Sequence, residues 1–205
     1  MRTKKTALYT HYAWRAEPLV FIAFTLLSIL NQKTTIFYII YLFWWTELLH
    51  LLIGRFFLRK QWRAASGPKT QQPSMFNHLF LMGIYWVFII VFFGLMANWR
   101  NEDIMMVNFE VLLFRNLFFN LNLAYIIMVR IGYCKTLTDL PPTPSLFTTG
   151  MIILHISVIV GGILMFFVVK KFPEIFTPEN LWGSAIIIAP FLALRLLIGR
   201  RLTEK

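Results

Sequence analysis

The sequence has little of what most enzymes use. A single cysteine, Cys134, excludes an internal disulfide and leaves no cysteine cluster for a metal ion. Only 14% of the residues are charged, and 9 of them are acidic. No nucleophile elbow, phosphate-binding loop, H-E-x-x-H or Cys-x-x-Cys motif occurs. No motif therefore supports enzyme chemistry directly.

Apolar residues are abundant instead. The chain is 58% hydrophobic and 17% aromatic, with a mean hydropathy of +0.65. A soluble domain has roughly 45 to 50% apolar and about 25% charged residues. Ten-residue alternating patterns, which are typical of membrane β-barrels, are absent. The composition predicts an all-α polytopic transmembrane helix bundle, in which each helix satisfies its own backbone polar groups.

Six apolar segments have roughly the length needed to cross a bilayer, about 20 residues for 30 Å of hydrocarbon. They form one transmembrane domain over residues 1–205. Two polar connections, 58–77 and 129–147, are predicted loops, and the first opens with an interfacial helix around Trp62. The predicted spans are 9–30, 35–57, 78–97, 104–128, 148–169 and 181–198.

Basic residues predict the orientation of the bundle. Fourteen of the 20 lysines and arginines fall on one side of the predicted spans and four on the other, with Arg115 and Arg195 inside spans. The positive-inside bias then places both termini in the cytoplasm and the chain in the cell inner membrane, beside anionic lipids. The net charge of +11 is spread over every predicted cytoplasmic loop, which argues against nucleic acid as a partner.

The fourth apolar segment carries polar residues on one face. In a continuous helix Asn108, Arg115 and Asn122 lie seven apart on one stripe, and Asn116 and Asn120 widen it. A charge near the bilayer centre costs at least about 2.5 to 3.5 kcal/mol, so such a residue normally faces the protein interior. We therefore expect this stripe to face the inside of the bundle.

Glu47 is the predicted partner of Arg115. Each residue lies roughly 16 to 18 Å from the outer end of its span at 1.5 Å per helical residue. Opposite charges at the same depth are expected to pair. The sequence leaves open whether this ion pair is structural or belongs to a functional site.

Three histidines form a second candidate group nearer the cytoplasmic ends. His50 lies one turn beyond Glu47, with the Glu-x-x-His spacing used once per helix in di-iron bundles. His78 opens the third span, and His155 lies in the fifth. Together the three histidines could ligate a haem or a metal, or pass protons. Each alone could also be an ordinary interfacial or packed side chain.

Short motifs resemble a prokaryotic family of multi-pass membrane proteins that is known only as a domain of unknown function. They are Trp45-Thr46-Glu47 followed by Gly54, Phe76-Asn77-His78, and Ile152-Ile153-Leu154-His155 followed by Gly161-Gly162. The resemblance implies a six-helix bacterial inner-membrane protein in which Glu47, His78 and His155 are shared polar positions. It implies no activity.

The sequence favours a non-enzymatic bundle with an intramembrane polar site around Glu47, Arg115 and His155. Such a site would bind or pass a small polar or anionic solute, or protons. Two alternatives stay open. The chain could be an accessory or assembly subunit whose polar stripe meets another protein or a second copy, or it could be a histidine-dependent haem or metal membrane enzyme. No cofactor is required by the sequence.

Overall fold

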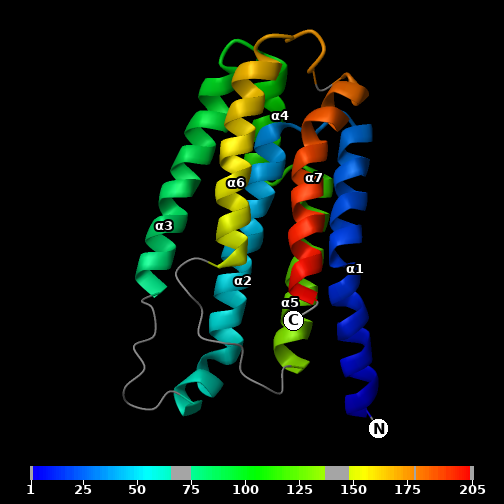
Figure 1. The fold of residues 1–205 in the computed structure, drawn as a ribbon, viewed down its shortest axis with the longest axis vertical. Coiled ribbons are helices and arrows are strands. Elements are labelled where there is room, and N and C mark those ends of the chain that lie inside the picture. The colour runs from blue at the N-terminus through cyan, green and yellow to red at the C-terminus, as the bar shows by residue number, and fades with distance from the viewer. Residues whose placement is uncertain (1, 66–74, 137–147, 178, 204–205) are drawn as a thin grey trace.

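The computed structural model describes residues 2–65, 75–136, 148–177 and 179–203, and in this part of the chain the regular structure is entirely helical. The helices run alongside one another, and the chain enters α1 and leaves α7 at the same end of the bundle (Figure 1). The elements are α1 (Arg2–Leu30), α2 (Ile36–Ala65), α3 (Met75–Phe88), η1 (Ile89–Leu95), η2 (Met96–Asn98), α4 (Glu102–Leu112), α5 (Leu117–Thr136), α6 (Thr149–Leu164), η3 (Met165–Val169) and α7 (Leu181–Thr203).

Four helical segments are long and apolar enough to cross a membrane, which associates the protein with one. They are Ile36–Phe57, Met75–Asn98, Glu102–Lys135 and Thr149–Val169. Two shorter apolar helices accompany them, Ala16–Leu30 and Leu181–Leu197.

Helix α2 forms the centre of the bundle. Every residue from Ile36 to Trp44 is buried, and a helix that is apolar and buried all round is a core helix. It packs against α1, α3, α5, α6 and α7. Gly161 of α6 lets that helix approach closely, because a Cβ there would lie 2.6 Å from Ile40 Cδ1.

Each of the six predicted spans corresponds to helical structure, but the predicted continuous fourth helix over 104–128 is wrong. It is broken between Leu112 and Leu117 into α4 and α5. The predicted loops are also shorter than expected, because α2 continues to Ala65 and α5 to Thr136. Residues 66–74 and 137–147 of those loops lie outside the described residues.

The break between α4 and α5 has a local cause. Phe114 adopts a left-handed backbone conformation, φ 57°, which costs energy for a residue with a bulky side chain. Two asparagines that follow it stabilise the break. Asn120 Nδ2 donates to Phe114 O at 2.6 Å, and Asn116 Oδ1 accepts from Phe119 N at 3.0 Å as the first turn of α5 begins.

Asn108 performs a similar role at the end of the bundle opposite the termini, which we call the far end. The π-helical segment η1 shifts its backbone hydrogen bonds. Asn108 Nδ2 donates to Phe93 O and Gly94 O of that segment, at 3.3 and 3.2 Å. Its Oδ1 accepts from Thr35 Oγ1 at 2.7 Å. The amide therefore joins α4 to both η1 and the start of α2.

Candidate functional site

The Glu47 carboxylate is held against the beginning of α6. Thr148 is the residue that caps α6, and its Oγ1 accepts from Met151 N at 3.1 Å. The same hydroxyl donates a short hydrogen bond to Glu47 Oε1. A Cβ at Gly150 would collide with Glu47 Oε2. The absence of a side chain at position 150 thus lets a buried carboxylate approach the positive end of the α6 dipole, where negative charge is stabilised.

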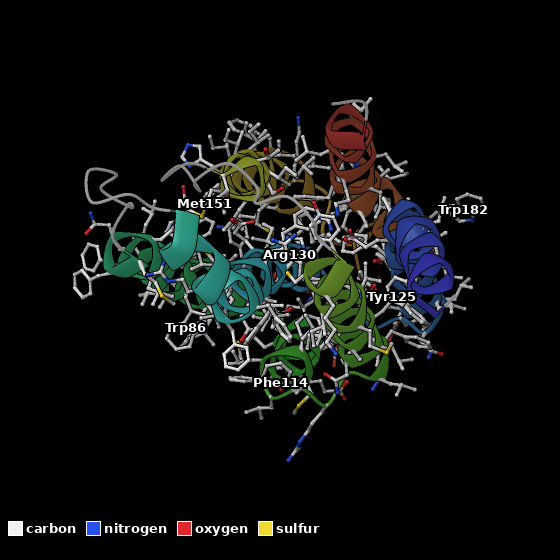
Figure 2. The ribbon with its side chains drawn as sticks, turned by 90° about the horizontal axis from the view of Figure 1, so that it is seen from below. Trp86, Phe114, Tyr125, Arg130, Met151 and Trp182 are labelled. Atoms are coloured by element: carbon white, nitrogen blue, oxygen red, sulfur yellow. The ribbon has the colours of Figure 1, made fainter. Side chains whose placement is uncertain are left out.

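Three basic side chains from three other helices surround this carboxylate. His78 of α3, Arg130 of α5 and Arg195 of α7 all interact electrostatically with Glu47. Figure 2, viewed from the end where the termini lie, shows Arg130 near the middle of the ring of helices. Its Nη2 lies 3.5 Å from where a Cβ of Gly54 would be, at ordinary van der Waals distance, so the guanidinium lies beside α2 at this level.

A second pair of opposite charges lies beside the first group. Arg195 of α7 forms a salt bridge with Glu17 of α1, and the two side chains are only 12% and 8% exposed. The Arg195 guanidinium also lies over the Phe21 ring, 5.3 Å from its centroid. A buried pair of this kind offsets its desolvation only when the geometry is good, and breaking it leaves a buried charge.

We call these side chains the polar centre: Glu17, Glu47, His78, Arg130, Thr148 and Arg195. Its two carboxylates and two guanidinium groups balance in charge. Two of its nitrogen atoms, Arg130 Nε and His78 Nε2, are buried and have no hydrogen-bond partner among the described residues. Most buried polar atoms are hydrogen bonded, so each exception requires an explanation.

The predicted contact between Glu47 and Arg115 is wrong. Arg115 lies in the break between α4 and α5, and its side chain is exposed. Among the described residues the salt bridges are Lys33 with Glu110 and Arg195 with Glu17. The depth estimate assumed a continuous helix, whereas the break turns Arg115 away from the bundle.

Three of the four asparagines of the predicted stripe do face inward. Asn108, Asn116 and Asn122 are all buried. Asn122 Nδ2 donates to Tyr38 OH at 3.3 Å, and Asn116 Nδ2 donates to Lys33 O at 3.1 Å. These amides connect helices and turns of the chain itself, so their observed contacts are structural.

The three histidines do not converge. His155 is exposed, and its Nδ1 is hydrogen bonded to Tyr85 OH at 2.5 Å. His78 is buried beside Glu47, and His50 interacts electrostatically with Arg130 and Arg195. Within the described part of the chain no three His, Cys, Asp or Glu side chains are placed to hold a metal ion. The predicted grouping of His50, His78 and His155 around one metal is therefore wrong.

The sequence pattern did not identify Arg130, Thr148 and Glu17 as members of the polar centre. Arg130 was counted among the basic residues that set the predicted orientation, and Glu17 lay within the predicted first span, 9–30, without an assigned role. Arg130 directly follows an apolar run, which could have indicated that the helix continues through it. In the structure α5 extends two turns beyond the predicted end of the span.

A cavity of about 40 Å³ lies away from the polar centre, at the far end. Thr34, Ile104, Met165, Phe176 and Ser184 are among its lining residues. Its location means that it offers no ready entrance to Arg130 or Glu47.

Comparison of this chain with protein-family models, with curated proteins and with solved structures finds no match. The geometry of the polar centre is therefore the basis for assigning a function to this chain.

Proposed function

We propose that this protein is a multi-pass protein of the cell inner membrane whose polar centre binds a small monovalent anion together with a proton. Arg130 holds the anion, and His78 takes up the proton. The observation that carries the proposal is the pair of buried, unpartnered nitrogen atoms, Arg130 Nε and His78 Nε2, on two helices around one carboxylate.

Charge balance is the reason for coupling the anion to a proton. Glu17 and Arg195 already neutralise one another, and Glu47 balances Arg130. An added anion would leave the centre with one excess negative charge in a medium of low dielectric constant, which is strongly unfavourable. Protonation of His78 removes that excess, since histidine is the side chain suited to gain a proton near neutral pH.

We propose Arg130 rather than Arg115 as the anion anchor, because Arg115 is exposed and Arg130 Nε is buried without a hydrogen-bond partner among the described residues. Ionisable residues inside membrane spans are commonly found in ion paths and proton relays, although purely structural pairs also occur. The resemblance to a membrane family of unknown function stays a prediction, as does the placement of both termini in the cytoplasm.

Calorimetric titration of the purified protein in lipid nanodiscs tests the proposal. Sodium chloride, nitrate and acetate would be titrated against sodium gluconate at equal ionic strength. We expect saturable binding of at least one anion, its loss in Arg130→Gln and its retention in Arg115→Gln, because Arg115 is exposed outside the centre. No saturable binding, or binding that survives Arg130→Gln, would contradict the proposal.

The proton is measured by repeating the titration in two buffers with different ionisation enthalpies. We expect uptake of about one proton for each bound anion in the native protein, and close to none in His78→Gln. Anion binding without proton uptake would leave Arg130 as the anchor but exclude the role of His78.

A further inference from the structure

At the far end the turn between α1 and α2 does not reach as far as the turn between α3 and α4, so this end of the bundle forms a step (Figure 1). Charged residues lie on the lower level of the step. The turn between α1 and α2 meets the break between α4 and α5, because Asn116 Nδ2 donates to Lys33 O. Lys33 Nζ also forms a salt bridge with Glu110 Oε2 at 2.7 Å. Helix α4 continues past this level toward the far end (Figure 1). Its 11 residues place the turn between α3 and α4 about 16 Å higher, at 1.5 Å per residue.

The upper level of the step carries exposed apolar side chains. Met96 of η2 is 63% exposed, and Phe167 of η3 is 71% exposed. Such side chains on the outside of long apolar helices are expected to contact lipid. Lys170 and Lys171 follow immediately after η3 and suit the headgroup level, with Lys170 Nζ turned back over the Phe166 ring at 4.5 Å. The lower level of the step therefore lies deep in the hydrocarbon.

At that depth, exposed irregular backbone and an unpaired charge are both energetically unfavourable. Residues 113–116 are not helical, and irregular backbone does not face lipid inside the hydrocarbon region. Lys33 and Glu110 neutralise one another. The exposed Arg115 is left as a positive charge at a depth where an unpaired charge is costly. Figure 2 shows the neighbouring Phe114 on the outside of the bundle. Something must cover this surface.

The chemistry of the surface identifies the kind of cover. Leu113 and Leu117, two residues on either side of Arg115, are 58% and 64% exposed, so apolar side chains flank the charge on both sides. A second copy that presented the same surface would place another Arg115 against the first. A lipid phosphate would have to descend about 16 Å below the headgroups, given the length of α4. An apolar helix that carries one carboxylate would neutralise Arg115 and cover the apolar side chains beside it.

We propose that the surface formed by Lys33, Glu110, Leu113, Phe114, Arg115 and Leu117 binds a transmembrane helix of a different protein, which places an aspartate or glutamate against Arg115. The carboxylate completes the ion pair, and the apolar body of the helix covers Leu113, Phe114 and Leu117. This partner surface is separate from the polar centre and does not depend on anion binding.

Photo-crosslinking in cells tests the proposal. A photoreactive amino acid replaces Leu117, and the same residue at Met128, an exposed position farther along α5, serves as the control. We expect one discrete adduct with another membrane protein from position 117 only. Its yield should fall about tenfold or more in Arg115→Gln and persist in Arg115→Lys, because the charge pair supplies much of the affinity. Arg130→Gln should leave the adduct unchanged.

The identity of the adduct decides among the alternatives. Support requires that the crosslinked helix contain an aspartate or glutamate whose replacement by asparagine or glutamine lowers the yield as Arg115→Gln does. Adducts with lipid alone, with a second copy of this chain, or with nothing would overturn the proposal. So would an adduct whose yield is the same in Arg115→Gln.

Discussion

Single amides account for most of the polar pattern of the fourth apolar segment. Asn108 binds backbone carbonyl groups of the π-helical segment η1, and Asn116 and Asn120 stabilise the backbone around Phe114. Asparagine side chains offer both donors and an acceptor, so they suit places where a helix begins, ends or changes its hydrogen bonding. The polar stripe in the sequence is thus largely explained by asparagine side chains that hydrogen bond to backbone groups where the helices are irregular.

Neighbouring residues 115 and 116 should respond very differently to substitution. Asn116→Ala removes the acceptor for Phe119 N and the donor to Lys33 O, so we expect a loss of about 1 kcal/mol in the free energy of unfolding. Arg115→Gln alters an exposed side chain, so the purified protein should change by less than about 0.5 kcal/mol. Thermal or denaturant unfolding in detergent measures both. Equal losses would contradict this account of the break.

Glu47 and Thr148 should be energetically coupled. Thr148→Val removes the hydroxyl that donates to Glu47 Oε1 and accepts from Met151 N. Glu47→Gln removes the negative charge at the beginning of α6. A hydrogen bond to a charged group is worth about 1.5 to 3 kcal/mol, so we expect each single change to destabilise and the double change to cost less than their sum. A double-mutant cycle measures the coupling, and strict additivity would show that the contact contributes nothing.

At the scale of whole elements, close helix approach depends on particular glycines. Gly161 faces Ile40 and Phe93, with a Cβ placed 2.6 and 3.1 Å from their nearest atoms, whereas a Cβ at Gly162 would meet nothing within 4 Å. The two adjacent residues differ only in the direction they face on α6. Of the two, only Gly161 therefore determines how closely α6 packs against the central helix α2.

Gly161→Ala should destabilise the protein by about 1 to 3 kcal/mol, because an added methyl group overpacks the contact with α2. Gly162→Ala should be neutral or slightly stabilising, since alanine favours a helix by up to about 1 kcal/mol relative to glycine. Midpoints of thermal unfolding in one detergent compare the two variants directly. A larger loss in Gly162→Ala would show that α6 presents a different face to α2.

At the scale of the molecule, the arrangement combines a packed polar centre in the half of the bundle nearer the termini with a charged step at the far end. Glu17, Glu47, His78, Arg130 and Arg195 come from five different helices. These side chains can meet only if the first turns of α3 and α6 pack beside Glu47 of α2 and Arg130 of α5. The two proposed sites use opposite ends and are testable separately.

The predicted orientation can be checked with single cysteines in a Cys134→Ser background. Lys135→Cys and Lys171→Cys are both exposed positions at opposite ends of the bundle. We expect a membrane-impermeant maleimide to label position 171 in intact cells, and position 135 only after the membrane is opened, as the positive-inside bias requires. The reverse pattern would invert the orientation of the bundle.

The sequence by itself determined the helical class and the location of all six helical regions, because long apolar segments leave the backbone no other way to satisfy its polar groups. It also predicted that Asn108, Asn116 and Asn122 face inward, and all three are buried, although the continuous helix behind that prediction is broken at Asn116. Glu47 was likewise recognisable as a buried charge, because it lies in the middle of an apolar segment.

Only the tertiary structure decided which charges meet. The left-handed backbone at Phe114 interrupts the helix and turns Arg115 outward, and no periodicity argument includes such a break. The partner of Glu47 is a hydroxyl far away in sequence, and it is reached only because position 150 lacks a side chain. Long-range pairs depend on how helices pack and rotate about their axes, and that is set by steric contacts summed over the whole bundle.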